Sequence, residues 1–407
     1  MTNSDPQKIN EILNRGVEEA IVREDLEKKL LSGKKLRIYF GVDPTGSVLH
    51  LGHAVNLWKL RDFQDLGHEV ILLIGDFTAR IGDPSGKDTA RKPLTEKEVK
   101  INFKNYKKQA SKILDFSKVK IKYNSTWLSK LKFADILKLA TNFTVQQMLQ
   151  RDMFDRRMKE NLPISLQEFM YPLMQGYDSV VLDVDLELAG NDQTFNALAG
   201  RTLQKIYNNK DKDVLTCKLL LGTDGRKMSK TFNNFIAIDD VPGDMFGKLM
   251  SMKDELIDQY FEIATRLSSQ QILEIKNSSD NPRDIKARLA KEIVKMYHGD
   301  EVATSAEEEF NKIFRNKELP TDMPVFETDK ANYFVPELLV DTKLASSKNE
   351  AKRLVEGGGV ETIMGDPSAG SGQVKKERIA DWKKEIVLED GIIIKVGSRK
   401  FVKIKIK

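Results

Sequence analysis

Two apolar runs with an amphipathic segment between them constrain the fold of this chain more than any other feature. The run LRIYFGV, at residues 36–42, has the composition of a buried strand, and the turn residues DPTG follow it. Apolar side chains then recur at helical spacing over residues 53–66, Gly67 ends that pattern, and EVILLIG is a nearly continuous apolar run. This order predicts a strand, a helix and a second strand of a parallel sheet.

A second unit of the same kind is predicted further along the chain. The segment VVLDVDLELAG, at residues 180–190, is predicted to be a strand, and NDQTFNALAGRTLQKI after it a helix. Two such units favour an α/β fold with a doubly wound, Rossmann-like parallel sheet, whose ligand site lies beyond the carboxyl ends of the strands. Residues 94–173, between the units, are too numerous for a plain loop and are predicted to be a mostly helical connecting insertion. The sheet domain is therefore expected to span residues 1–235.

The rest of the chain is predicted to form two smaller domains. Residues 236–320 have the pattern of several amphipathic helices, for example NPRDIKARLAKEIVKMYHG with Gly299 as its stop signal, and we expect a separate helical domain there. A small α+β domain is expected at residues 337–407. The linker before it contains three prolines, Pro320, Pro324 and Pro336.

Local patterns support the predicted C-terminal domain. Ser347 and Glu350, in SKNEAKRLVEGGG, have the spacing of a capping box at the start of a helix. The alternating segment IIIKVGSRKFVKIKI predicts a hairpin. Between them, ETIMGDPSAGSGQVKKERI is long and rich in glycine and serine for a turn, so we expect it to disturb the local strand pairing.

Charge and cysteine content exclude several classes of protein. The net charge is only +5, from 66 basic and 61 acidic side chains, so overall charge does not indicate nucleic-acid binding. Residues 395–407 carry basic but no acidic side chains, which fits a phosphate-facing patch or, equally, a solvated edge strand protected by lysines. The single cysteine, Cys217, excludes an internal disulfide framework and a multi-cysteine metal cage. Neither a signal peptide nor an apolar run of membrane-spanning length is recognised, so a cytoplasmic location is expected.

The first motif with chemical meaning is PTGSVLHLGH, at residues 44–53. It places His50 and His53 at the start of a helix directly after a strand, where unpaired N–H groups and the helix dipole suit a polyphosphate. Imidazoles there can donate hydrogen bonds to the charge that develops on an α-phosphate under attack. The same two histidines would also fit a structural cap or half of a metal site.

The second motif is a lysine loop. The residues KMSKT, at 227–231, follow the flexible segment GTDG, so two lysines lie on a loop that can close over a pyrophosphate leaving group and neutralise it. Lysine-rich surface loops are common, so this pentapeptide alone is weak evidence. Because it lies downstream of the histidine motif, the pentapeptide becomes specific evidence for a site that binds a polyphosphate.

The two motifs in this order resemble the signatures of class I aminoacyl-tRNA synthetases, spelled HLGH and KMSKT in this chain. The strings GVDPTG, IGDPSGK, YPLMQGYD, AGNDQ and NPRDIK are similar to those of bacterial-type tyrosyl-tRNA synthetases, and the C-terminal domain resembles the RNA-binding tail of that family. The resemblance covers nearly the whole chain. It implies that tyrosine is activated with ATP to tyrosyl-adenylate and pyrophosphate, and is then transferred to the 3' end of the tRNA for tyrosine.

The resemblance also implies roles for matching residues. Tyr39 and Asp178 would hold the phenolic hydroxyl of the substrate, and three further residues would hold its α-amino group. The residues implied for tyrosine are Tyr39, Asp43, Asp83, Tyr171, Gln175, Asp178 and Gln193. Those implied for ATP are Gly41, His50, His53, Gly190, Asp192, Lys227, Met228, Ser229, Lys230 and Thr231. Those implied to face the phosphates or to stabilise the departing pyrophosphate are Thr45, His50, His53, Lys87, Arg91, Lys227 and Lys230.

The same resemblance implies the partners of the chain. Mg²⁺ would be held mainly by the ATP phosphates, because the sequence shows no dedicated metal site. The tRNA would rest on the helical domain and on the C-terminal domain, whose expected RNA-binding residues are Lys348, Lys352, Arg353, Arg399 and Lys400. That domain would alternatively fit a small oligomerisation module. A homodimer is implied through the connecting insertion, although its apolar residues, such as Ile136, Leu137, Leu139 and Ala140, would equally serve a core.

Three rival functions remain to be weighed. A tryptophanyl-tRNA synthetase shares both signatures, but the pair Tyr39 and Asp178 argues against it, because a buried phenol and carboxylate are costly without a hydroxyl partner. A small-molecule nucleotidylyltransferase uses a similar histidine motif, but the helical and C-terminal domains do not suit it. A non-catalytic RNA-binding protein derived from a synthetase is disfavoured by the intact histidines and lysines.

Overall fold

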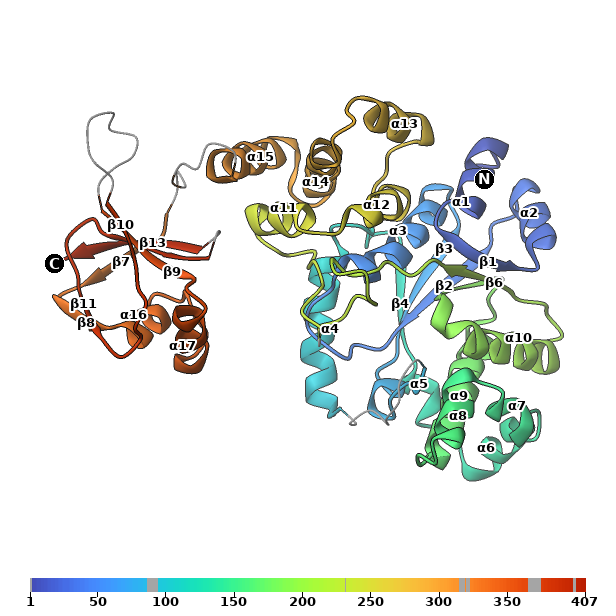
Figure 1. The fold of residues 1–407 in the computed structure, drawn as a ribbon. Helices are drawn as coiled ribbons and strands as arrows, with labels where there is room; N and C mark the ends of the chain where they lie inside the picture. The colour runs from blue at the N-terminus through green and yellow to red at the C-terminus, as the bar shows by residue number, and fades with distance from the viewer. Residues whose placement is uncertain are drawn as a thin grey trace. The chain divides into compact units, whose positions relative to one another are not determined.

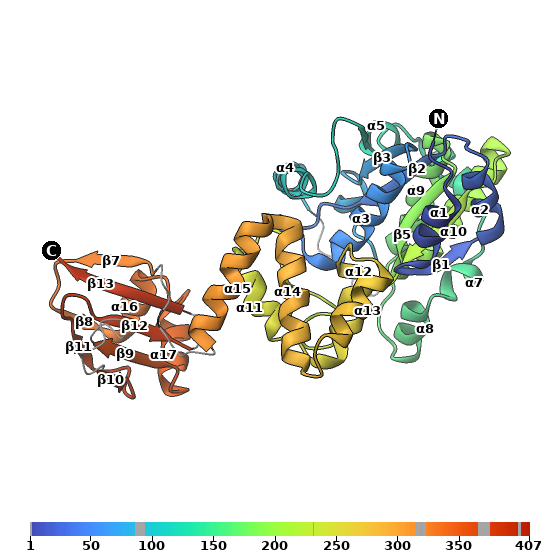
Figure 2. The same cartoon turned by 90° about the horizontal axis from the view of Figure 1, so that it is seen from above.

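The computed structural model describes residues 2–85, 94–230, 232–314, 319, 323–364, 375–397 and 400–407, with Asp152 described by its backbone only. The chain divides into two compact units, residues 1–300 and residues 301–407. Figure 1 shows the fold of each unit, and Figure 2 shows it from above. Among the described helices, none is long and apolar enough to cross a membrane.

The core of the first unit is a six-stranded sheet in the order β1-β6-β5-β2-β3-β4. Its strands are β1 (Val17–Ile21), β2 (Arg37–Val42), β3 (Glu69–Ile74), β4 (Val119–Tyr123), β5 (Leu186–Gly190) and β6 (Asp213–Cys217). Every neighbouring pair is parallel except β1 with β6. The prediction of a doubly wound α/β sheet is therefore confirmed.

The order of the strands places a topological switch between β2 and β5. From β2 the chain moves outward through β3 to β4, and it returns to the other side of β2 to form β5 and β6. The connections after β2 and β5 thus diverge and leave a crevice beyond the carboxyl ends of these two strands. This crevice is where a ligand site is expected.

The first predicted strand–helix–strand unit is confirmed as β2, α3 (Leu51–Asp65) and β3. The second prediction is partly wrong, because residues 180–182 form the last turn of α9 (Leu166–Leu182) and only residues 186–190 are strand. Asp183 ends the helix in the left-handed conformation, with φ 47°. The apolar periodicity of a buried helix end and of a buried strand are alike, so the sequence pattern did not separate them. The predicted helix after β5 is confirmed as α10 (Thr194–Asn208), behind a short 3-10 turn.

The prediction of a mostly helical stretch at residues 94–173 missed a strand. After α4 (Glu96–Ala110), β4 completes the sheet as its edge, and its alternating sequence VKIKY fits a strand that is exposed on one side. The helices that lead from β4 to α9 are α5 (Ser125–Leu128), α6 (Phe133–Ala140), α7 (Val145–Leu149) and α8 (Asp152–Lys159). In Figure 1 α6, α7, α8 and α9 lie together at one end of the unit.

The N-terminal segment and the helices after the sheet pack into the same unit. The N-terminal helices are α1 (Pro6–Asn14) and α2 (Arg23–Leu31), and the later ones are α11 (Pro242–Met250), α12 (Ile257–Ala264), α13 (Ser269–Asn277) and α14 (Pro282–His298). The Arg15 guanidinium joins the two groups, because it donates hydrogen bonds to the carbonyls of Glu262 and Thr265 at 2.8 and 2.9 Å. The observed division thus differs from the predicted helical domain at 236–320. Gly299, predicted as a stop signal, ends α14 with φ 91°.

The second unit begins within α15 (Asp300–Phe314) and contains a five-stranded sheet in the order β10-β9-β12-β13-β7. Its other elements are β7 (Val325–Thr328), β8 (Asn332–Phe334), α16 (Val335–Asp341), α17 (Lys348–Glu356), β9 (Val360–Met364), β10 (Lys375–Arg378), β11 (Glu385–Val387), β12 (Ile393–Val396) and β13 (Lys400–Ile406). The predicted hairpin is confirmed as β12 and β13. Pro336 lies in the first turn of α16 and not in a linker, a position where its missing N–H costs nothing.

Two further predictions for this unit have mixed outcomes. Ser347 Oγ accepts from the Glu350 N–H at 3.2 Å, but the Glu350 carboxylate accepts from the Ser346 N–H at 2.7 Å, so the capping box closes one residue early. The expected disturbance of strand pairing is wrong for the flanks of the glycine-rich segment, because β9 and β10 pair in register from Met364 with Lys375 onward. Residues 365–374 lie outside the described residues.

Candidate active site

A cavity of about 940 Å³ lies beyond the carboxyl ends of β2 and β5. Of the residues predicted for tyrosine, ATP and catalysis, all those that the structure describes line this cavity. These are Tyr39, Gly41, Asp43, Thr45, His50, His53, Asp83, Tyr171, Gln175, Asp178, Gly190, Asp192, Gln193, Lys227, Met228, Ser229 and Lys230. Lys87, Arg91 and Thr231 lie outside the described residues.

Tyr39 and Asp178 lie at the buried end of this cavity. The Tyr39 hydroxyl is 2.9 Å from Ser179 Oγ, and the ring packs on Ile71 and Leu182. Burial, followed by the charge of Glu187, raises the pKa of Tyr39 well above its usual value, so the phenol stays protonated. Burial likewise raises the pKa of Asp178. A polar pair in apolar surroundings suits a ligand hydroxyl that donates to one group and accepts from the other.

Two residues that sequence reasoning missed hold the Asp178 carboxylate. The Trp127 indole Nε1 donates to Oδ1 at 2.7 Å, and the Asn124 amide donates to Oδ2 at 3.2 Å. Both hydrogen bonds lower the pKa of Asp178 and so oppose the effect of burial. The signal for Asn124 was its place directly after a strand of the sheet, but β4 itself was not predicted.

The middle of the cavity holds the residues predicted for the α-amino group. Asp83 Oδ2 accepts from the Gln193 amide at 2.7 Å, and Tyr171 OH donates to Asp43 Oδ2 at 2.8 Å. Thr78 donates to the other oxygen of Asp43 at 2.7 Å. Carboxylates and amide oxygens therefore converge on one region, which suits a cation such as an ammonium group.

Main-chain pairing brings the two signature motifs together. The Leu51 N–H donates to the Ile236 carbonyl at 2.9 Å, and the Ile238 N–H donates to the Leu49 carbonyl at 3.0 Å. The segment after the lysine loop is thereby fixed against the start of α3. This tertiary pairing explains why the motifs at residues 50–53 and 227–231 share one cavity.

The two histidine rings of the first motif lie close together, tilted by 34°, and are uncharged. Their ring centroids are 3.8 Å apart, and the main-chain N–H of His50 donates to His53 Nδ1 at 3.2 Å. Burial, with the positive charges of His53 and Lys230, lowers the pKa of His50 to about 2. Desolvation by the cleft walls, followed by the Lys230 charge, lowers the pKa of His53 to about 4 although part of its side chain reaches solvent. Both rings are therefore neutral near pH 7 and can act as hydrogen-bond donors.

The lysine loop is organised by Asn234, a buried residue that was not predicted. Its side chain accepts from the Ser229 N–H at 2.8 Å and donates to Asp224 at 2.7 Å. Lys227 pairs with Asp192 at 3.0 Å. Lys230 reaches over Gly46, since a Cβ added there would lie 2.7 Å from its Nζ. Two ammonium groups thus border the cavity on the side of the histidines.

The predicted RNA-binding residues lie in the second unit. Lys348 and Arg353 are exposed on α17, and Lys352 lies over the Trp382 ring at 4.2 Å. Lys400 donates to the Leu344 carbonyl at 3.0 Å, which brings the hairpin next to the loop before α17. Arg399 lies outside the described residues. Several tail lysines have acidic partners, Lys395 with Glu361 and Lys405 and Lys407 with Glu327.

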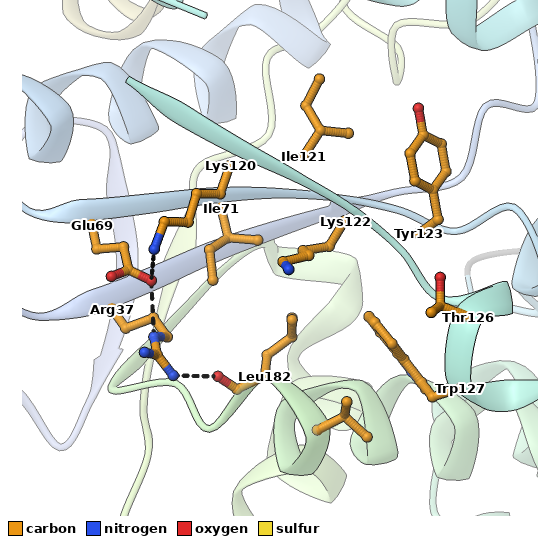
Figure 3. Close-up of a pocket in the computed structure, with 11 residues that line it drawn as sticks. Arg37, Glu69, Ile71, Lys120, Ile121, Lys122, Tyr123, Thr126, Trp127 and Leu182 are labelled. Atoms are coloured by element: carbon orange, nitrogen blue, oxygen red, sulfur yellow. Dashed lines mark hydrogen bonds and ion pairs between the residues drawn. The ribbon is translucent and has the colours of Figure 1, made fainter. Parts of the chain in front are cut away.

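A second hollow, of about 570 Å³, lies at the β4 edge of the sheet (Figure 3). Glu69 pairs there with Arg37 and Lys120, at 2.9 and 3.2 Å, so much of its charge is balanced internally. The hollow shares one wall with the active-site cavity, because Trp127 lines it while its indole nitrogen reaches Asp178.

Comparisons with known proteins extend these observations. A family model described as tRNA synthetases class I (W and Y) matches residues 31–315. The tyrosine–tRNA ligase of Thermotoga maritima is 46% identical over 404 residues, which are 98% of this chain and 98% of the relative. The tyrosine–tRNA ligase of Moorella thermoacetica is 45% identical over 402 residues, 97% of this chain and 94% of the relative.

Solved structures share the fold. A C-terminally truncated mitochondrial tyrosyl-tRNA synthetase of Aspergillus nidulans has a TM-score of 0.64 at 23% identity, over 75% of this chain and 94% of that one. The tyrosyl-tRNA synthetase of Archaeoglobus fulgidus, solved with L-tyrosine, has a TM-score of 0.60 at 24% identity, over 74% of this chain and 100% of that one. The predicted resemblance is confirmed: this chain belongs to the class I aminoacyl-tRNA synthetases of the tryptophan and tyrosine group, and its full-length relatives are tyrosine–tRNA ligases.

Proposed function

We propose that this class I synthetase is a tyrosine–tRNA ligase and that the cavity described above activates L-tyrosine with ATP. The observation that carries the proposal is the convergence, in one cavity, of a buried phenol and carboxylate with the histidine and lysine motifs. The first pair recognises the amino acid, and the motifs stabilise the reacting phosphates.

The buried end of the cavity selects the phenol. The substrate hydroxyl donates to Asp178 and accepts from Tyr39, so both buried groups are satisfied. Phenylalanine would leave both without a partner. Tryptophan carries a donor but no acceptor, and so it could not satisfy Tyr39.

The middle of the cavity holds the amino group. Asp83, Tyr171 and Gln175 surround the ammonium, and Asp43 and Gln193 lie beside it through their hydrogen bonds to these residues. This arrangement fixes the carboxylate of tyrosine for in-line attack on the α-phosphate. The reaction then needs orientation and charge stabilisation rather than a covalent enzyme intermediate.

The phosphate side of the cavity stabilises developing charge. Neutral His50 and His53 donate hydrogen bonds to the α-phosphate, and Lys227 and Lys230 neutralise the departing pyrophosphate. Lys227 would exchange its partner Asp192 for phosphate when ATP binds. The Asp43 carboxylate accepts from Thr78 and Tyr171, so Mg²⁺ would enter with ATP and keep phosphate oxygens as its main ligands.

The second step transfers tyrosine to the 3' end of the tRNA for tyrosine. The basic face of α17 and the adjoining end of β13 bind the tRNA backbone through Lys348, Lys352, Arg353, Arg399 and Lys400. The enzyme would act in the cytoplasm, where tRNA is aminoacylated for protein synthesis.

A homodimer forms through the helices between β4 and α9. Phe133 and Leu137 on α6 are 75% and 52% exposed, and Leu166 at the start of α9 is 75% exposed. Of the residues named for this face from sequence, Leu139 is buried and serves the core instead. Apolar exposure on neighbouring helices favours a protein partner.

ATP–pyrophosphate exchange tests the proposal. The purified protein is assayed with tyrosine, tryptophan, phenylalanine and no amino acid in parallel. Exchange that depends on tyrosine alone is the expected result. Dependence on tryptophan would assign the chain to the sister enzyme, and folded protein without exchange would favour a non-catalytic RNA-binding role.

A further inference from the structure

A buried ion pair lies directly beneath the tyrosine end of the cavity. Lys212, just before β6, is fully buried, and its ammonium group contacts Glu187 of β5. The same Nζ donates to Ser179 Oγ at 2.9 Å and to the Ala197 carbonyl at 3.0 Å. These partners use all three N–H groups of the ammonium, so the lysine is held in one orientation.

The absence of a side chain at Gly200 makes room for this arrangement. A Cβ at that position of α10 would lie 2.5 Å from Lys212 Nζ and 2.6 Å from Ser179 Oγ. Both distances are shorter than nonbonded contacts with a carbon atom allow. The fold therefore leaves a space shaped for a lysine ammonium and a serine hydroxyl.

The lysine determines where the Ser179 proton points. An ammonium group only donates, so Ser179 Oγ must accept from Lys212 and keeps one proton to give. That proton faces either the Tyr39 hydroxyl at 2.9 Å or the Glu187 carboxylate at 3.5 Å. Only the first distance is that of a normal hydrogen bond between oxygen atoms. When Ser179 donates to Tyr39, the Tyr39 proton is free to face the cavity.

The carboxylate determines the orientation of a second side chain. Glu187 accepts from the Gln175 amide nitrogen at 2.9 Å. Because a carboxylate only accepts, the NH₂ group of Gln175 must face Glu187, and its carbonyl oxygen must face away. That oxygen is the atom that an ammonium group requires.

We propose that the buried pair of Lys212 and Glu187 positions the groups that bind both polar ends of tyrosine. Lys212 acts through Ser179 and turns the hydroxyl proton of Tyr39 toward the phenol oxygen of the substrate. Glu187 acts on Gln175 and turns its carbonyl oxygen toward the substrate ammonium. This inference rests on the proposed function, from which the roles of Tyr39 and Gln175 are taken.

A purely structural role explains the pair less well. Replacing a buried ion pair by apolar side chains of similar volume is often neutral or stabilising, so stability alone does not require charges here. The pair instead joins two side chains that line the cavity, and neither Lys212 nor Ser179 lines it.

The first test removes one oxygen atom. In Ser179→Ala, kcat/KM for tyrosine in pyrophosphate exchange is expected to fall about tenfold, the effect of one hydrogen bond, while kcat/KM for phenylalanine stays within about twofold. The same substitution in a Tyr39→Phe background should cause no further loss, because Ser179 acts through the Tyr39 hydroxyl.

The second test removes both charges. The double variant Lys212→Met with Glu187→Gln should raise KM for tyrosine about tenfold or more, since a glutamine at position 187 can present either end of its amide to Gln175. The control Lys29→Met breaks the 2.7 Å bond to Asp213, next to Lys212 but outside the cavity. It should keep the KM of the unmodified enzyme.

The outcomes separate the inference from the proposed function. If Tyr39→Phe leaves the preference for tyrosine over phenylalanine unchanged, the phenol site itself is wrong. If Tyr39→Phe lowers that preference while Ser179→Ala and the double variant keep it, the positioning role is overturned and the proposed function stands. An equal loss of kcat for both amino acids, with KM unchanged, would reduce the pair to a structural role and also overturn the inference.

Discussion

The indole nitrogen of Trp127 donates a 2.7 Å hydrogen bond to Asp178, from a helix that lies between the edge strand and the connecting helices. Asp178 is buried, and burial raises its pKa, which opposes the ionised form. A carboxylate must nevertheless be present to accept the proton of the substrate phenol. Trp127 and Asn124 donate hydrogen bonds that lower the pKa against the effect of burial and so favour the ionised acceptor.

Trp127→Phe should therefore weaken tyrosine activation. Loss of a hydrogen bond to a charged group costs on the order of 1.5–3 kcal/mol, so we expect kcat/KM for tyrosine to fall by at least about tenfold. Pyrophosphate exchange between pH 6 and pH 9 measures the effect. An unchanged kcat/KM for tyrosine in this variant would contradict this explanation.

Tyr39→Phe should lower the preference for tyrosine over phenylalanine, by about tenfold, because one hydrogen bond to the phenol is lost. The ratio of kcat/KM for the two amino acids is the measurement. Activation of phenylalanine should change little. An unaltered ratio would remove Tyr39 from the hydroxyl site.

His50→Ala and Lys230→Ala should each reduce adenylate formation by about a hundredfold or more. The first removes a hydrogen-bond donor and the second removes a positive charge, and both groups stabilise the negative charge that develops on the phosphates. Binding of tRNA should be nearly unchanged, since it depends on other surfaces. Single-turnover adenylate formation and a filter-binding assay measure the two properties. Equal loss of both would point to misfolding.

Stability should fall as the pH falls below about 6.5. The folded-state pKa values of His50 and His53, about 2 and about 4, lie below the ordinary value of 6.5, so the unfolded chain binds protons that the folded chain does not. Their contribution is complete above pH 6.5 and is lost progressively on acidification. Urea unfolding at pH 7.5 and 5.5 tests this, and the variant His50→Gln with His53→Gln should show a smaller difference. Burial also lowers the pKa of His68, to about 4, so some pH dependence should remain.

Phe133→Asp should dissociate the proposed homodimer. The side chain is 75% exposed on α6, so the unpartnered chain tolerates a carboxylate there, whereas an apolar interface would not. Sedimentation at assay concentration should show a dimer for the unmodified enzyme and a monomer for the variant. Ile206→Asp, an exposed residue on α10, serves as the control. A monomeric unmodified enzyme would refute the interface.

Patterns within short segments predicted much of this protein. Apolar runs identified β2, α3 and β3, since burial on both faces of a parallel sheet requires continuous apolar sequence. The half-exposed strand β4 was not predicted, because apolar and charged residues alternate in VKIKY and the segment lies within a mostly helical stretch. The end of α9 was mistaken for a strand, because the end of a buried helix and a buried strand are both apolar.

The sequence by itself determined the family, the order of the main elements and many of the residues that line the cavity, because spacing and motif order are local properties. Only the tertiary structure revealed Trp127, Asn124, Asn234 and the pair of Lys212 and Glu187. In the sequence Lys212 belongs to the charged segment NKDKD, which has the composition of an exposed loop. Its burial depends on Glu187, Ser179 and the space at Gly200, which come from three other elements and meet only when the sheet and its helices pack.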